Sequence, residues 1–186
     1  MVVDAFRAST TISVLVSKGA RVVPVASIEE AASYAGADYR IGERGSAKVH
    51  GFDFGNSPTE IEATELKKGA TIVLSTTNGT RIVEAACGAP AILAGTFVNA
   101  HAVADGLASG AYGVRFAVIG CGWAGRRASE DESAAGAILY RLREAGAKVD
   151  EQAERLGYEK DLDFCLAENT VPVVPRLEGG AFVGRR

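Results

Sequence analysis

The sequence predicts an α/β protein with a mostly parallel or mixed sheet, in a three-layer α/β/α arrangement. Short runs of β-branched residues alternate with alanine-rich stretches along most of the chain, a rhythm typical of strands joined by crossover helices. The 186 residues are 47% hydrophobic and 23% charged, which favours a folded protein over a disordered one. A single unit with a buried core is therefore expected.

The elements follow from local patterns in chain order. A strand opens the chain as MVV, a helix follows around TTISVLVSKG, and RVVPV is a second strand. Ser27 and Glu30 have the spacing of a capping box that opens the next helix. Beyond these, we predict strands at 71–75, 91–95 and 114–119 and helices at 79–87, 99–109 and 132–146. Prolines restrict the run VPVVP at 171–175 to an edge strand.

Two segments share one scheme. VVDAFRASTTISVL and IVLSTTNGTRIVEA each read as an apolar strand, a turn rich in Ser, Thr and Arg, and then a helix. The similarity is compatible with a duplication, but strand–turn–helix units also resemble one another without one. It stays open whether residues 1–186 are one simple unit or contain two similar lobes, 1–90 and 91–186.

Composition and charge exclude several classes of function. The 20 cations and 23 acids give a net charge of −3 without a basic stripe, which argues against nucleic acid as a partner. No apolar run is long enough to cross a bilayer, and the first residues lack the basic-then-apolar order of a signal peptide. The three cysteines, Cys87, Cys121 and Cys165, are widely spaced, as in reduced compartments. We expect a cytoplasmic protein with a small-molecule ligand, and a homo-oligomer is left open.

Two predicted turns between a strand and a helix are rich in hydrogen-bond donors. They are RASTT at 7–11 and TTNGTR at 76–81. Helix N-termini attract phosphate and carboxylate groups, and Arg7 and Arg81 could each grip an oxyanion with two hydrogen bonds. Ordinary capping needs a single Ser or Thr, so these turns indicate anion binding. The candidate hydroxyl and amide donors are Ser9, Thr10, Thr76, Thr77, Asn78 and Thr80.

Carboxylates also occur next to predicted strands and in the glycine-rich segment. Asp4 ends the first strand, Glu43 and Asp53 lie in the glycine-rich segment 42–58, and Glu130 and Asp131 belong to SEDES after a predicted strand. Acids in a first helical turn also suit the helix dipole, so SEDES alone decides little. Together with anion-binding turns, these acids have the composition of a Mg²⁺ site completed by substrate oxygens. Phosphate chemistry with Mg²⁺ is the leading hypothesis.

Four segments carry a family resemblance: VVDAFRASTTI, GERGSAKVHGFDFGNSPTE, LSTTNGTR and SEDESAAGAIL. In this order the sequence resembles the 2-phosphosulfolactate phosphatase family up to about residue 146. The resemblance implies a single phosphatase-like unit on a two-lobed α/β fold. It also implies a Mg²⁺-dependent enzyme that removes phosphate from 2-phospho-3-sulfolactate, a step toward coenzyme M. By resemblance, the site is lined by Asp4, Arg7, Glu43, Arg44, Asp53, Asn56, Ser57, Asn78, Arg81, Glu130 and Asp131.

Roles for these residues follow as expectations. Asp4 or Asp53 would orient the attacking water, with Arg7 and Arg81 as the other catalytic groups. The expected Mg²⁺ ligands are Glu43, Asp53, Glu130 and Asp131. The expected substrate contacts are Ser9, Thr10, Arg44, Asn56, Ser57, Thr76, Thr77, Asn78 and Thr80. The glycines of 42–58 would let its backbone approach a charged substrate, while Phe52 and Phe54 anchor the segment to the core.

Three alternatives remain. GCGWAG at 120–125, with Asp150 further on, has the outline of a dinucleotide-binding motif, but the helix is expected to start too late and amid acids. Cys121 and Arg127 have the spacing of cysteine-dependent phosphatases, although the neighbouring acids would raise the pKa of the thiol. A module that binds anions without turnover is the third.

Overall fold

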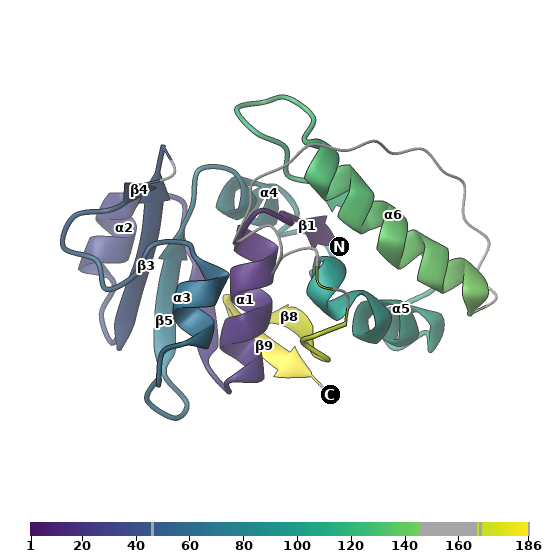
Figure 1. Cartoon of the computed structure of the whole chain (residues 1–186), viewed down its shortest axis with the longest axis horizontal. Helices are drawn as coiled ribbons and strands as arrows, with labels where there is room; N and C mark the ends of the chain where they lie inside the picture. The colour runs from purple at the N-terminus through teal and green to yellow at the C-terminus, as the bar shows by residue number, and fades with distance from the viewer. Residues whose placement is uncertain (46, 146–166, 168, 186) are drawn as a thin grey trace.

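The computed structural model describes residues 1–45, 47–145, 167 and 169–185. Within these ranges, strands and helices alternate along most of the chain (Figure 1). The strands are β1 (Val2–Val3), β2 (Arg21–Pro24), β3 (Tyr39–Arg44), β4 (Ala47–Lys48), β5 (Thr71–Ser75), β6 (Ala94–Gly95), β7 (Ile119–Gly120), β8 (Val174–Glu178) and β9 (Ala181–Arg185). The helices are α1 (Ala8–Ser17), α2 (Ile28–Ser33), α3 (Pro58–Glu62), α4 (Gly79–Ala85), the 3₁₀ turn η1 (Phe97–Asn99), α5 (Ala100–Ala108) and α6 (Ser129–Glu144).

The strands form two sheets. A three-stranded parallel sheet has the order β6-β1-β7, and a six-stranded sheet has the order β4-β3-β5-β2-β9-β8. In the larger sheet β2, β3 and β5 are parallel, whereas β4, β8 and β9 pair antiparallel. An isolated bridge between Leu93 and Arg176 joins the segment before β6 to β8. The predicted α/β class with a mixed sheet is confirmed.

Each sheet combines strands that are far apart in the chain. β1 lies between β6 and β7, while β8 and β9 extend the sheet that contains β2, β3 and β5. Helices α5 and α6 pack together at one end of the molecule, and α2 and β4 lie at the other (Figure 1). Whether the chain contains two similar lobes stays a prediction.

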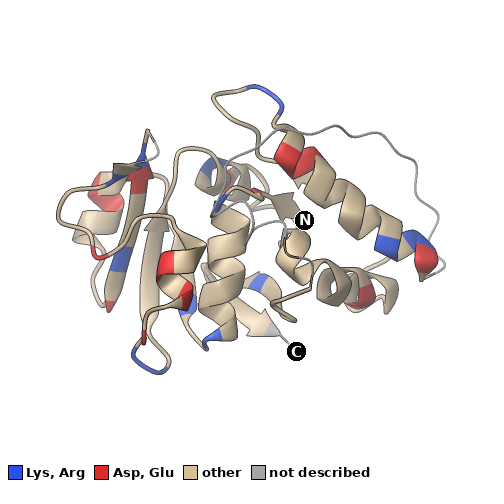
Figure 2. Ribbon diagram, viewed as in Figure 1, with Lys and Arg blue, Asp and Glu red and all other residues tan. Residues whose placement is uncertain are grey.

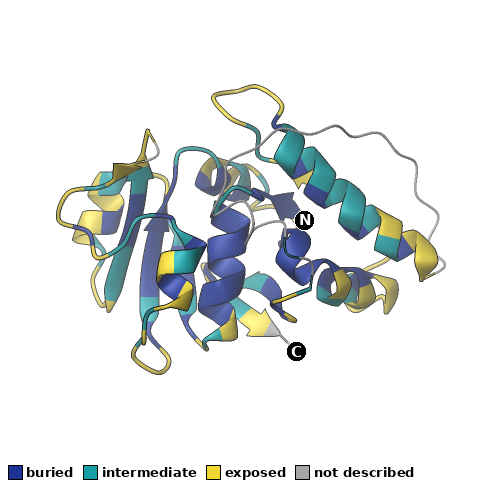
Figure 3. Cartoon of the chain, viewed as in Figure 1, coloured by how far each residue is buried: buried dark blue, intermediate teal, exposed yellow. Residues whose placement is uncertain are grey.

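Helix α1 lies at the centre of the molecule and is buried along almost its whole length (Figure 3). All of residues 8–16 are buried, including the polar ones. The hydroxyls of Thr10 and Ser13 donate hydrogen bonds of 2.8 Å to the backbone carbonyls of Ala5 and Ser9, respectively. Because buried polar groups need partners, these bonds explain how a helix rich in Ser and Thr can occupy the core. They also fix α1 to the chain that follows β1.

Several element boundaries differ from those predicted. Of the predicted strand 114–119 only Ile119 is in a strand, β7, which pairs with the two residues of β1. Helix α6 begins at Ser129, three residues before the predicted start, so the acids of SEDES form its first turn. Their charges suit the positive end of the helix dipole. The end predicted for this helix, residue 146, lies outside the described residues.

One finer prediction is confirmed, and a second is confirmed in part. The hydroxyl of Ser27 accepts a 3.0 Å hydrogen bond from the N–H of Glu30 at the start of α2. An edge strand of the larger sheet, β8, also forms near the C-terminus, but it spans Val174–Glu178, so only Val174 and Pro175 of the predicted run 171–175 belong to it. Among the described residues, no helix combines the length and apolar character that a membrane span requires.

Candidate active site

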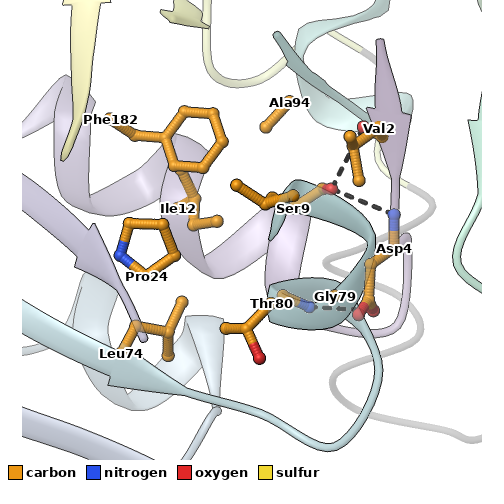
Figure 4. Close-up of a pocket in the computed structure, with 12 residues that line it drawn as sticks. Val2, Asp4, Ser9, Ile12, Pro24, Leu74, Gly79, Thr80, Ala94 and Phe182 are labelled. Carbon is orange, nitrogen blue, oxygen red and sulfur yellow. Dashed lines mark hydrogen bonds between the residues drawn. The ribbon is translucent and has the colours of Figure 1, made fainter. Parts of the chain in front are cut away.

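Asp4 lies immediately after β1, at the carboxyl end of the parallel sheet, where open α/β sheets bind their ligands. Its side chain is buried, and its Oδ1 accepts a 3.0 Å hydrogen bond from the N–H of Ala8 in the first turn of α1. Its own N–H donates a 2.9 Å hydrogen bond to the hydroxyl of Ser9 (Figure 4). On the other side is Gly79, the first residue of α4, where a Cβ would come within 2.8 Å of Oδ2. The carboxylate therefore lies between the starts of two helices.

Other carboxylates gather around Asp4. Burial raises the pKa of Asp4 to about 6, and the negative charges of Glu43 and Glu130 add to the rise, while the N–H of Ala8 opposes it. Burial and the charge of Asp4 raise the pKa of Asp131 to about 7. Such effects require that these side chains lie within electrostatic range of one another. The acids come from three separate parts of the chain, and Figure 2 shows those of α6 in its first turn.

Glu43 and Arg44 lie at the end of β3 and contact the end of β5 and the turn that follows it. Thr77 donates a 3.4 Å hydrogen bond to Oε1 of Glu43. The guanidinium of Arg44 donates a 3.1 Å hydrogen bond to the hydroxyl of Ser75, the last residue of β5. These contacts tie the end of β3 to the turn between β5 and α4.

The glycine-rich segment is anchored as predicted. Phe52 is buried, and a Cβ on Gly42 would come within 2.6 Å of its ring, so glycine is required there for the ring to pack. Phe54 packs against the core, with its ring centroid 5.7 Å from that of Tyr39. The segment can thus be polar along its length and still hold a fixed course beside β3.

The predicted hydroxyls of the first turn face the interior. Ser9 and Thr10 are buried; Ser9 accepts from the N–H of Asp4, and Thr10 donates to the carbonyl of Ala5. The hydroxyl of Thr10 also lies 3.1 Å from that of Thr96, which follows β6. These side chains support the backbone on either side of the Asp4 carboxylate. That they also contact substrate stays a prediction.

Two buried polar atoms, one in the second turn and one in the glycine-rich segment, have no partner among the described residues. They are Oγ1 of Thr76 and Oδ1 of Asn56, respectively. Thr80 donates a 3.1 Å hydrogen bond to the carbonyl of Thr76, and Asn78 stands at the N-cap of α4 without a capping side-chain bond. Buried polar atoms are normally satisfied, so these oxygens are candidates to meet a ligand. Thr76 also borders Gly79, 3.5 Å from the position of its added Cβ.

Two predicted site residues lie apart from Asp4. The carboxylate of Asp53 accepts a 2.7 Å hydrogen bond from the N–H of Arg40, near the beginning of β3 rather than at its end. Ser57 is the N-cap of α3, where its hydroxyl accepts a 3.4 Å hydrogen bond from the N–H of Glu60. The structure does not bring Asp53 together with Glu43 and the other acids.

The two predicted catalytic arginines belong to the turns that flank Asp4. Arg7 is half-buried immediately before α1, with its guanidinium 5.3 Å from the centroid of the Phe6 ring. Arg81 is exposed in the first turn of α4. Their positions are compatible with two anion contacts on either side of Asp4, which stays a prediction.

Comparison with known proteins agrees with this arrangement. A family model described as 2-phosphosulpholactate phosphatase matches residues 1–155. The chain belongs to the 2-phosphosulfolactate phosphatase family. It is 36% identical to the probable 2-phosphosulfolactate phosphatase of Thermotoga petrophila, over 98% of this chain and 90% of that protein. The identity is 35% to the proteins of the same description from Gloeobacter violaceus, over 94% and 86%, and Carboxydothermus hydrogenoformans, over 100% and 87%. The resemblance found in the sequence is confirmed, and the family is one of phosphoric monoester hydrolases.

The carboxylates of this family member suit a cation that needs few protein ligands. In the part of the chain that the structure describes, no three His, Cys, Asp or Glu side chains are arranged to enclose a metal ion. Mg²⁺ usually takes one or two carboxylates and completes its shell with water and substrate oxygens. Asp4 with either Glu43 or Glu130 would meet that requirement, whereas both oxygens of Asp131 accept backbone hydrogen bonds.

The thiol alternative has little structural support in this phosphatase. Burial raises the pKa of the Cys121 thiol well above its usual range, and the charges of Asp4 and Asp131 raise it further. Arg127, whose side chain is 82% exposed, pairs with Glu132. A thiol held in its protonated form is a poor nucleophile.

The dinucleotide alternative also lacks the expected geometry. Trp123 and Arg126 exchange two backbone hydrogen bonds of 2.9 Å, which makes GCGWAG part of a tight turn, and α6 begins only at Ser129. A pyrophosphate would therefore meet no helix N-terminus at the third glycine. Asp150, the acid in this reading, and Cys165 lie outside the described residues.

Sequence reasoning missed three residues that shape the site. Ser75 binds Arg44, Gly79 allows the carboxylate of Asp4 to approach α4, and Thr96 packs against Thr10. Ser75 and Thr96 each follow the apolar residues of a buried strand, so their place at a strand end was a usable signal. The need for glycine at 79 depends on a contact with a residue 75 positions away and has no local signal.

Proposed function

We propose that this family member is a Mg²⁺-dependent phosphatase that hydrolyses 2-phospho-3-sulfolactate to 3-sulfolactate and inorganic phosphate. The observation that carries the proposal is the gathering of Asp4, Glu43 and Glu130 beside the starts of α1 and α4. Carboxylates next to anion-binding helix ends suit a metal-bound phosphate and little else. The family supports the choice of substrate.

Asp4, with either Glu43 or Glu130, would hold Mg²⁺. Bound there, the ion would offset the negative charge that develops on the transferred phosphoryl group. Asp131 is excluded from this set because both of its oxygens are engaged with backbone N–H groups. Asp53 is excluded because its carboxylate lies near the start of β3.

The chain's own groups would bind the substrate and position water. Arg7 and Arg81 would bind the phosphate and the acidic groups at the other end of the substrate. Asp4, as a ligand of the ion, would orient the attacking water, and with a pKa of about 6 it is largely ionised at neutral pH even without the ion. The water oxygen bonds to phosphorus, the ester P–O bond breaks, and the leaving oxygen takes up a proton.

The test is release of inorganic phosphate from 2-phosphosulfolactate, with phospholactate and 3-phosphoglycerate as comparison substrates. Activity should disappear with EDTA and return with added Mg²⁺. Glu43→Gln and Glu130→Gln should each raise the Mg²⁺ concentration needed for half activity, whereas Glu62→Gln, on exposed α3, should not. Activity that survives complete chelation would refute the metal dependence, and preference for a comparison substrate would refute the assigned substrate.

A further inference from the structure

Asp131 has a bonding pattern unlike that of its acidic neighbours in α6. Its Oδ1 accepts a 2.8 Å hydrogen bond from the N–H of Ala5, which directly follows Asp4. Its Oδ2 accepts a 2.8 Å hydrogen bond from the N–H of Gly122, two residues beyond β7. One side chain thus joins the backbone after β1 to the backbone after β7, over sequence distances of 126 and 9 residues.

The surroundings leave this carboxylate little freedom. Asp131 is 3% exposed. A Cβ on Gly120 would come within 3.2 Å of the Asp131 Cβ, so the start of α6 lies close to the end of β7. Both backbone polar groups of Ala5 are bound, because its N–H donates to Asp131 and its carbonyl accepts the 2.8 Å hydrogen bond from Thr10. With Ser9 holding the N–H of Asp4, the backbone on both sides of the Asp4 side chain is fixed.

Two simpler roles fit less well. A helix-capping acid accepts hydrogen bonds from the N–H groups of its own first turn, but both bonds of Asp131 go to other segments. A Mg²⁺ ligand needs an oxygen that can turn toward the ion, and the two oxygens of Asp131 are held by backbone N–H groups of two separate segments. Glu130, the preceding residue, is half-buried and better placed for that task.

We propose that Asp131 is a positioning residue, which fixes the location of Asp4 by clamping the chain after β1 to the chain after β7. It does not bind the metal. The kinetic part of this inference rests on the proposed phosphatase function, whereas the clamp itself can be measured without any substrate. Displacement of a reacting group by about 1 Å can reduce the rate about 10²-fold, so a clamp of this kind can control turnover.

The first measurement is amide hydrogen exchange. In the wild-type protein the amides of Ala5 and Gly122 should be protected although both lie outside the strands. In Asp131→Asn they should exchange about 10-fold faster or more, because a carboxylate acceptor is replaced by an amide that can serve at most one of them well. Glu132→Gln, a change in the same helical turn, should leave both amides protected. Unprotected amides in the wild-type protein would overturn the clamp, even if the variant failed to fold.

The second measurement separates positioning from metal binding. Asp131→Asn should lower kcat about 10²-fold without changing the Mg²⁺ concentration for half activity. Asp131→Glu keeps a charged oxygen ligand but adds a methylene group where there is no room, so it should lower kcat to a similar extent. Retained turnover in Asp131→Glu, or rescue of Asp131→Asn by high Mg²⁺, would show that Asp131 is a ligand. If wild-type protein releases no phosphate from any substrate, the proposed function fails, and the exchange measurement alone decides the clamp.

Discussion

Replacement of Asp4 by asparagine should make the metal-free protein more stable at pH 8 while abolishing phosphate release. The ionised carboxylate of Asp4 is buried and faces other negative charges, so the folded protein holds it at a free-energy cost. Asparagine has nearly the same shape and its oxygen can still accept the hydrogen bond from Ala8. Because asparagine carries no charge, the folded variant avoids that free-energy cost. It also loses the ability to bind Mg²⁺ or to accept a proton.

The magnitude follows from the pKa. Folding raises the pKa of Asp4 from 3.8 to about 6. At about 1.4 kcal/mol per pKa unit, the ionised side chain lowers the free energy of unfolding by up to about 3 kcal/mol above pH 6. The folded state binds the proton more tightly than the unfolded state, so this cost is absent below about pH 3.8 and develops as pH rises through 6. The advantage of Asp4→Asn should therefore grow from pH 4.5 to pH 8.

The assay is urea unfolding of both proteins in EDTA at pH 4.5 and pH 8, followed by the same melts with Mg²⁺ at pH 8. Mg²⁺ should stabilise the wild-type protein and have little effect on Asp4→Asn. The kcat/KM of the variant should fall at least 10²-fold. A variant that is less stable than wild type by the same amount at both pH values would refute the reasoning, since the carboxylate would then not be strained in the folded protein.

Four other substitutions test the surroundings of Asp4. Gly79→Ala would place a methyl group 2.8 Å from Oδ2 of Asp4, so kcat should fall about 10²-fold; normal kinetics in this variant would mean that the two residues are not in contact. Arg7→Lys and Arg81→Lys keep the positive charge but lose the guanidinium, which can donate two parallel hydrogen bonds to an oxyanion. Each substitution should lower kcat/KM about 10²-fold and leave the circular dichroism spectrum unchanged. A variant with unchanged kcat/KM would show that its arginine does not touch substrate. Cys121→Ser should keep most of its activity. Iodoacetamide at pH 8 should not inactivate the wild-type protein, because the thiol of Cys121 stays protonated. If iodoacetamide inactivated the wild-type protein rapidly but not Cys121→Ser, the thiolate mechanism would be restored.

Most elements with a clear local pattern were predictable. Residues 71–75 form a strand as their apolar run indicates, and Ser27 caps α2 as its spacing from Glu30 indicates. The predicted strand at 114–119 is the instructive failure, because strand pairing depends on tertiary context as well as on β propensity. The order of the strands was not predictable either, since β8 and β9 join β2 across most of the chain length.

The sequence by itself determined the family and suggested the chemistry that we propose for the site, because residue type fixes what a side chain can do. Carboxylates at strand ends and turns rich in Ser, Thr and Arg indicated anion and Mg²⁺ chemistry, and the family resemblance gave the substrate. Tertiary structure decided which of these residues meet. Asp4, Glu43 and Glu130 follow or belong to elements of different parts of the fold, β1, β3 and α6, and the charges of Glu43 and Glu130 reach Asp4, whereas Asp53 remains near the beginning of β3. It also decided that Asp131 has both oxygens bound to backbone, since hydrogen bonds between segments 126 residues apart leave no trace in local sequence.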